Sequence, residues 1–234
     1  MTSGTDLTLE KQWLSEQHAR TVVNNLQKKN ISAQYVPGRQ EALAAVLNMI
    51  PAGVTVARGD SISVDQIGII EELKKRKQEV IDPHERNADG SYLYPDIKQR
   101  NMVARKAFTA DVYLVGTNAV TLDGKLVNID AWGNRVSAMI FGPEKVIIVA
   151  GVNKIVRDAD EGIARIHNIA APMNAKRHFL KHNRTDFGNL PCARTGTCIN
   201  CNNDWRLCRY TVIIEGSMIR EKGRINVVLV GEEL

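Results

Sequence analysis

Apolar side chains recur at steps of three and four residues in two stretches near the N-terminus. The stretch from Leu9 to Leu26 predicts a long helix whose apolar stripe includes Trp13, and the stretch from Leu43 to Ile50 predicts a second helix. Proline and glycine at positions 51–53 end the second pattern. We expect the two helices to form an N-terminal arm, residues 1–50, packed on the main domain.

Beyond residue 50, short apolar runs alternate with helical patterns. The expected strands are 54–57, 79–81, 112–116, 126–129 and 146–150. The expected helices are 63–73, which begins with capping-box spacing at Ser63 and Gln66, 97–107 and 136–141. This alternation predicts an α/β domain over residues 51–234, with a mostly parallel sheet and helices on both of its faces.

The last third of the chain contains one more helical pattern and two more strands. The helix at 163–169 begins near Asp158 and should stop near Pro172, because proline cannot continue the hydrogen-bond ladder. The strands at 211–214 and 225–230 flank a charged connection that contains glycine. We expect them to form a terminal hairpin at an antiparallel edge of the sheet.

Composition narrows the class of protein. Hydrophobic residues make up 44% of the chain, which is enough for a buried core. The start has no basic stretch followed by an apolar one, and no run reaches the roughly 18 apolar residues that cross a bilayer. We therefore expect a cytoplasmic protein that does not bind membranes. A net charge of +5 favours a small anionic metabolite as ligand, and with 5% aromatic residues we expect no nucleic-acid binding.

All four cysteines fall within residues 183–209, a stretch without an apolar pattern. The spacing Cys192-x5-Cys198-x2-Cys201-x6-Cys208 supplies four thiolates, enough for a tetrahedral zinc ion or an iron-sulfur cluster. A long stretch without secondary structure is unusual in a compact domain, so we expect a metal to hold this cysteine-rich loop. The spacing does not choose between an iron-sulfur cluster, zinc, and free or disulfide-bonded thiols.

Other signatures of chemistry are few. His178 and His182 have a spacing that can place two imidazoles on one metal, although the same spacing occurs on ordinary helix faces. Asp123 and Asp130 have the residue type of a catalytic general acid and base, but two aspartates seven residues apart are common and do not by themselves indicate catalysis. The sequence contains no P-loop, dinucleotide-binding, serine-hydrolase or zincin motif. The catalytic residues, if the protein is an enzyme, therefore stay unknown.

Polar side chains cluster after several of the expected strands. In parallel α/β folds, ligands bind beyond the carboxyl ends of the strands. We predict that a ligand contacts Ser61, Thr117, Asn118, Asp123, Asn128, Asp130, Asn134 and Arg135. Arg135 and the amides at the start of the following helix suit a phosphate or carboxylate, while the same residue types also suit turns and helix caps.

Several of these segments together resemble the lactate-utilisation (LUD) domain family. The motifs are T-N-A-V-T at 117–121 with D-G at 123–124, L-V-N-I-D at 126–130, G-N-R-V at 133–136, G-P at 142–143, V-A-G-V-N-K at 149–154 and A-A-P-M-N-A-K-R at 170–177. The cysteine segment is similar to that of stand-alone members of the family. The resemblance covers residues 54–234.

The resemblance implies a fold similar to that of the ribose-phosphate isomerase, glucosamine-phosphate deaminase and CoA transferase superfamily. It also implies an accessory role in the oxidation of lactate to pyruvate or in related organic-acid metabolism, with other lactate-oxidation subunits as partners. CoA transferases use a glutamate nucleophile, and this sequence offers no match for it. The resemblance therefore does not extend to acyl-transfer chemistry.

Three functions are compatible with the sequence. The first is an accessory redox protein whose cysteines hold an iron-sulfur cluster. The second is an enzyme or sensor that binds a phosphorylated or CoA-linked molecule at the strand ends, with a structural metal. The third is an assembly module, in which the helix that carries Trp13 pairs with another chain, including a second copy in a homo-oligomer.

Overall fold

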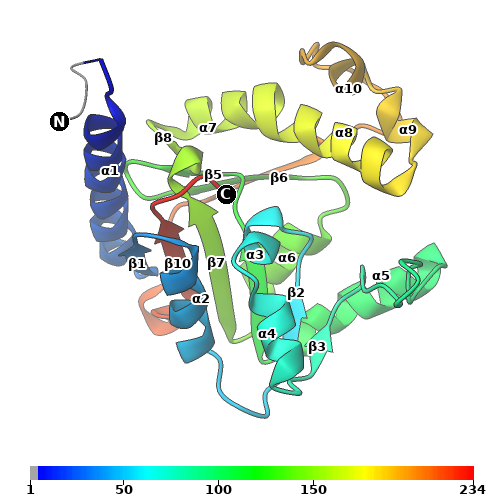
Figure 1. The fold of residues 1–234 in the computed structure, drawn as a ribbon, viewed down its shortest axis with the longest axis horizontal. Helices are drawn as coiled ribbons and strands as arrows, with labels where there is room; N and C mark the ends of the chain where they lie inside the picture. Colours follow the sequence, from blue (N-terminus) through cyan, green and yellow to red (C-terminus); the bar gives the residue numbers. More distant parts are fainter. Residues whose placement is uncertain (1–4) are drawn as a thin grey trace.

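The structure, a computed structural model, describes residues 5–234, and a parallel sheet forms its centre (Figure 1). The sheet has six strands in the order β1-β10-β7-β4-β2-β3, and every neighbouring pair is parallel. These strands are β1 (Ser32–Val36), β2 (Val56–Arg58), β3 (Val80–Ile81), β4 (Val112–Gly116), β7 (Lys145–Gly151) and β10 (Ile225–Val230). The predicted α/β class with a mostly parallel sheet is confirmed.

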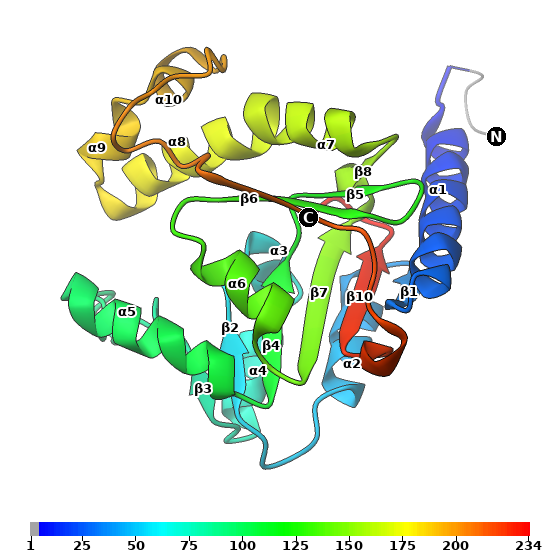
Figure 2. The same cartoon turned by 180° about the vertical axis from the view of Figure 1, so that it is seen from behind.

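Helices cover both faces of this sheet, as predicted. One face packs against α2 (Arg39–Asn48), α3 (Ile62–Gln66) and α4 (Ile69–Lys75). The other face packs against α1 (Thr8–Lys28), α6 (Asn134–Phe141) and the short helix η1 (Lys106–Thr109), which continues α5 (Ile97–Arg105). Figure 2 shows α5 and α6 on this second side. The central strands are therefore buried on both sides, which explains their unbroken apolar runs.

A smaller sheet lies beside the carboxyl ends of the large one. It has the order β8-β5-β6-β9 and contains β5 (Ala119–Thr121), β6 (Leu126–Asp130), β8 (Ile155–Val156) and β9 (Tyr210–Ile214). The predicted hairpin of the last two strands is wrong, because β9 pairs with β6 and β10 lies between β1 and β7. The apolar run of β10 is buried along nearly its whole length, which favours a central position over an edge.

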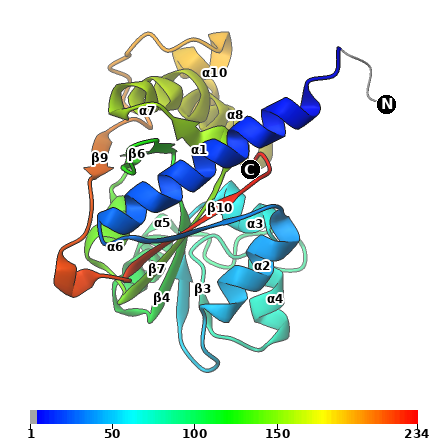
Figure 3. The same ribbon diagram turned by 90° about the vertical axis from the view of Figure 1, so that its left-hand side faces the viewer.

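The N-terminal segment contributes to the main domain as well as to its surface. Within the expected arm, of which residues 1–4 lie outside the described range, residues 32–36 form β1 at an edge of the main sheet. The C-terminal half of α1 is buried through Val22 and Leu26, whereas Leu9 and Trp13 are 64% and 63% exposed. Figure 3 shows this N-terminal half of α1 projecting beyond the body of the molecule.

A long helix crosses above the carboxyl ends of the strands (Figure 1). It joins α7 (Ala159–Arg165), a π-helical turn η3 (Ile166–Ala170) and α8 (Ala171–His182). The predicted stop near Pro172 is therefore wrong. Ala171 donates its amide to Ile166, five residues back, so a wider turn takes up the irregularity at proline and the helix continues.

Two local features also differ from the sequence prediction, the cap of α3 and the loop at 183–209. Ser61, rather than Ser63, caps α3, because its Oγ accepts the amide of Val64 at 3.4 Å. The loop at 183–209 is not structureless, since it contains α9 (Thr185–Gly188) and α10 (Pro191–Thr195).

Within residues 5–234 no helix combines the length and apolar character needed to cross a membrane.

Candidate functional site

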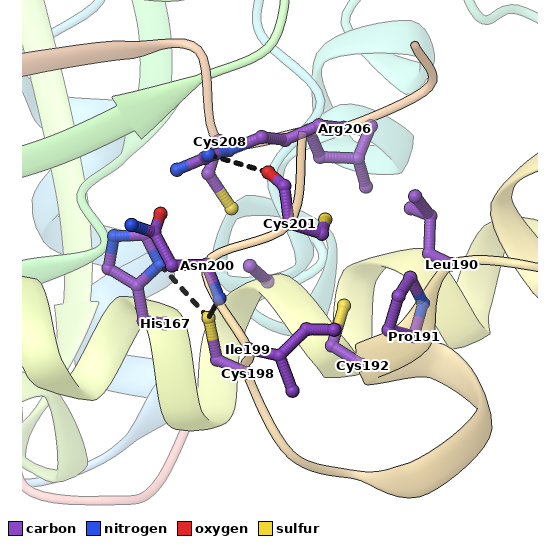
Figure 4. A pocket seen from close by; sticks show the side chains of 12 residues that line it. His167, Leu190, Pro191, Cys192, Cys198, Ile199, Asn200, Cys201, Arg206 and Cys208 are labelled. Carbon is purple, nitrogen blue, oxygen red and sulfur yellow. Dashed lines mark hydrogen bonds between the residues drawn. The ribbon is translucent and has the colours of Figure 1, made fainter. Parts of the chain in front are cut away.

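The four cysteines lie around one small cavity (Figure 4). Cys192 lies on α10, Cys198 and Cys201 lie on the loop that follows, and Cys208 lies two residues before β9. All four are half-buried free thiols. The cavity has a volume of about 20 Å³, which is room for a single ion or water molecule. The structure therefore brings together the side chains that the sequence proposed as metal ligands.

One imidazole also reaches this cavity from the long helix. His167, on the π-helical turn η3, places Nδ1 at 3.5 Å from Sγ of Cys198 (Figure 4). The backbone amide of Asn200 donates to the same sulfur at 3.4 Å. Sequence reasoning missed His167 because it precedes the first cysteine by a whole helix. The only sequence signal is that histidine is a common metal ligand.

The histidine pair that the spacing singled out lies elsewhere. His182 Nδ1 is 2.8 Å from Arg86 Nη2 and 2.9 Å from the hydroxyl of Tyr92. His178 packs against the ring of Phe187 at 5.1 Å between centroids, and burial lowers its pKa to about 4. Neither histidine lines the cysteine cavity.

Burial favours the protonated form of two of the thiols, Cys192 and Cys208. Burial raises the pKa of Cys208 to about 11. Burial, followed by the neighbouring thiols Cys201 and Cys198, also raises the pKa of Cys192. Among residues 5–234, no three histidine, cysteine, aspartate or glutamate side chains already stand in a metal-ligand arrangement. The donor set suits a thiophilic metal, and binding one would require the thiols to lose protons and move closer together.

The cysteine segment has its own small hydrophobic core. Phe187, on α9, is 1% exposed and packs with Leu190 and Leu207. The rings of Trp132 and Trp205 meet it edge-on, at 6.3 and 5.8 Å between centroids. These contacts pack the segment against α8.

The polar residues at the strand ends form a network centred on Arg135. Its Nη1 donates to Asn128 Oδ1 at 2.7 Å and to the Gly116 carbonyl at 3.2 Å. Its Nη2 donates to Asn118 Oδ1 at 2.8 Å and to the Ile129 carbonyl at 3.1 Å. The guanidinium thus ties the end of β4 to β6 and uses its donors on internal acceptors.

Two other predicted ligand-contacting residues, Asp130 and Thr117, also form hydrogen bonds within the strand-end loops. Asp130 Oδ2 accepts the amides of Arg135 and Val136, both at 3.1 Å, and so binds the start of α6. Thr117 donates its hydroxyl to the Ala119 carbonyl at 3.0 Å and is almost fully buried. These groups shape the loops as the turn and cap interpretation expects.

The remaining predicted contacts are spread over three places. Ser61 caps α3, next to the end of β2. Asn134 lines a second small hollow near β2 and β4. Asp123 lies on the turn between β5 and β6, where its carboxylate is 3.8 Å from Lys29 beside α1. The structure therefore separates Asp123 from the other polar strand-end residues.

An ion pair that the sequence did not reveal joins α8 to the end of β2. Arg177 Nη2 donates to Asp60 Oδ2 at 2.6 Å, and Nη1 donates to Oδ1 at 3.1 Å. Burial opposes the charge on Asp60, but Arg177 outweighs it and holds the pKa of this carboxyl well below its usual range. This pair, at the edge of the hollow that contains Asn134, fixes α8 above the strand ends.

The cysteine site and the strand-end loops are neighbours. The first residue of β9, Tyr210, pairs with Asp130 of β6, and the amide of Arg209 donates to the Asp130 carbonyl at 3.0 Å. Cys208, just before this pair, packs against the core of the small sheet. The two groups of residues are distant in sequence but share one scaffold.

Comparison with protein families decides the classification. The sequence model of the LUD domain matches residues 19–230, nearly the whole chain. The chain belongs to the LUD domain family. The match begins within α1, so the LUD domain includes β1 and α2 as well as the part from residue 54 onward that the motifs indicated. No curated protein matches this LUD chain in sequence.

The chain is similar to several solved structures. A DUF162 family protein from Deinococcus radiodurans is 12% identical and matches with a TM-score of 0.51, covering 92% of the LUD chain and 98% of its own. The translation initiation factor eIF-2B of Pyrococcus horikoshii is 18% identical, with a TM-score of 0.35 over 53% of the LUD chain and 49% of its own. The eIF2B delta of Chaetomium thermophilum is 13% identical, with a TM-score of 0.34 over 54% and 50%.

Proposed function

We propose that this LUD protein is a cytoplasmic accessory protein of organic-acid oxidation, such as the oxidation of lactate to pyruvate, and that its cysteine segment binds an iron-sulfur cluster. The observation that carries the proposal is the convergence of four thiols from three chain segments on one cavity. Thiols stay reduced in the cytoplasm, so a cluster of four there indicates a metal or redox site. Membership of the LUD family supports the metabolic role.

The four cysteines are the residues that would hold the group. A bound iron-sulfur cluster would supply one-electron transfer, and zinc, the alternative, would only hold the segment. The cavity of about 20 Å³ has room for one ion, so a cluster would require the loop that carries Cys198 and Cys201 to rearrange. The amide of Asn200, which already points to a sulfur, and the imidazole of His167 would stabilise negative charge there.

The strand ends give less support to a phosphorylated or CoA-linked ligand. Arg135, the residue that suggested such a ligand, uses four hydrogen bonds on acceptors of the protein itself. For partner subunits of lactate oxidation, the exposed half of α1 with Leu9 and Trp13 offers an apolar surface. We assign contact with those subunits to that surface. A mixed-subunit mass in solution would support the assignment.

The proposal is tested by metal content in a matched pair of variants. Cys201→Ser should lose the bound metal, because one of four ligands is replaced by a hydroxyl that binds iron poorly. Asn202→Ala, the exposed neighbour, should keep the wild-type metal content. Elemental analysis and labile-sulfide assay of anaerobically purified proteins provide the comparison. Equal metal content in the two variants would refute a cysteine-ligated site.

A further inference from the structure

A lysine amine lies half-buried at the carboxyl end of β7. Lys154, in the short helix η2 (Val152–Lys154), donates a hydrogen bond from Nζ to the hydroxyl of Ser63. Ser63 is completely buried in α3. The amine therefore lies among the loops that follow the parallel strands, the place where α/β proteins bind ligands.

Two arginines lie near this amine, and their hydrogen bonds go to neutral groups. Arg165, on α7, donates to the carbonyls of Asn153 and Asn118 at 3.1 and 2.7 Å. The guanidinium of Arg135 donates only to amide and carbonyl oxygens. Burial and then the charges of Arg165 and Arg135 lower the pKa of Lys154 to about 8. In the part of the chain that the structure describes, none of the three forms an ion pair with a carboxylate.

A group of half-buried cations without a counter-ion is unfavourable, because each charge has lost part of its hydration and repels the others. Bound anions remove both costs. We propose that Lys154, Arg165 and Ser63 form a binding site for the carboxylate of a small organic acid. The positive charge of Arg135 raises the electrostatic potential at this site without a direct contact to the ligand.

The available donors suit a carboxylate better than a phosphate. Lys154 has three N–H donors, of which one points to Ser63. Arg165 uses Nε and Nη1 on backbone carbonyls, which leaves Nη2 without an acceptor among residues 5–234. The two remaining N–H groups of Lys154 and the two of Arg165 Nη2 match the acceptor sites on the two oxygens of a carboxylate, whereas a phosphate has more oxygens and a second charge to satisfy. The choice of an organic acid also rests on the proposed function.

The site lies close to the cysteine cavity along the chain. Arg165 ends α7, and His167, which contacts Cys198, follows two residues later on the same continuous helix. The acid would thus bind to the helix that also contributes to the thiol cavity. The proposed carboxylate site and the proposed metal site would then both include residues of the helix that runs from α7 to α8.

The experiment measures thermal unfolding midpoints with pyruvate, lactate or inorganic phosphate, each against sodium chloride at equal ionic strength. The wild type should gain stability with the two carboxylates. Lys154→Met should lose this gain and should be no less stable than wild type in buffer without the acids, because an uncompensated charge is removed. Lys145→Met is the matched control, since Lys145 lies at the opposite end of β7 and binds the Met49 carbonyl. It should keep the wild-type response.

Amine labelling of the wild type gives a second measurement that needs no variant. Pyruvate should slow acetylation of Lys154 and leave Lys145 unchanged, as peptide mass spectrometry would show. Three results would each overturn the carboxylate site. They are an equal shift of the unfolding midpoint with carboxylates in wild type and Lys154→Met, no protection of the wild-type Lys154 amine by pyruvate, and a larger shift of the wild-type midpoint with phosphate than with the carboxylates. Metal content measured on the same samples separates this failure from failure of the proposed function, because the anion response can vanish while the metal remains.

Discussion

At the scale of single residues, the strand-end polar groups serve mainly one another. The sequence indicated Asp130 and Arg135 by their type and their position after expected strands. It could not show that Asn118 and Asn128 supply the acceptors for Arg135, because these partners are set by the pairing of β5, β6 and β9. His167 and Lys154 were missed for the same reason, since their neighbours belong to remote segments.

Arg135 should therefore be important for stability. Replacing Arg135 with Met removes four hydrogen bonds and deprives buried acceptors such as Asn128 Oδ1 of their charged donor. We expect a loss of roughly 2 to 4 kcal/mol in the free energy of unfolding. Arg157→Met, at an exposed arginine whose ion pair with Asp158 is screened by solvent, should cost much less. Urea unfolding compares the two, and similar losses would contradict the network.

The lowered pKa of Lys154 predicts that the free energy of unfolding depends on pH in the alkaline range. Burial lowers its pKa from 10.5 to about 8, so between these values the folded protein binds fewer protons at this site than the unfolded chain. Its contribution to stability is fully present above pH 10.5 and is lost as the pH falls to about 8. The difference in unfolding free energy between wild type and Lys154→Met should change across this window. Parallel pH profiles of the two proteins would rule out the shifted pKa.

At the scale of elements, apolar periodicity located most helices and strands but not their partners. The strand at 225–230 was expected in a hairpin and instead lies inside the main sheet, between β1 and β7. The helix expected to stop at Pro172 continues because a π-helical turn precedes it. In the first case the decisive contacts join residues far apart in sequence, and a local pattern does not contain them. In the second case the decisive bond is local, from the Ala171 amide to the Ile166 carbonyl, but apolar periodicity does not reveal a π-helical turn.

The cysteine segment should depend on its aromatic core. Phe187→Ala removes a buried ring between α8, α9 and the loop, at a cost of about 3 to 5 kcal/mol. We expect limited proteolysis within residues 183–209 to become faster. Phe141→Ala, at a ring that is 87% exposed, serves as the control. Unchanged cleavage of the Phe187 variant would mean that another contact holds the segment.

At the scale of the whole molecule, α1, β6 and the long helix connect regions that the sequence keeps apart. The pairing of β6 with β9 places Cys208 beside the strand-end loops, and the helix from α7 to α8 carries Arg165, His167 and Arg177 over them. The class of fold follows from the sequence. The division of the strands into two sheets does not, because the runs at 126–129 and 211–214 were expected in the main sheet and form part of the smaller one. The common scaffold of the two sites follows only from the tertiary structure.

The most direct test of the central claim is metal analysis of the anaerobically purified wild-type protein, combined with its visible absorption spectrum. The account predicts iron and labile sulfide bound to the protein, with the absorption of thiolate-ligated iron. Stoichiometric zinc and no visible absorption would contradict the electron-transfer role and leave a structural site. A protein that binds neither metal, with four free thiols, would contradict the metal site itself.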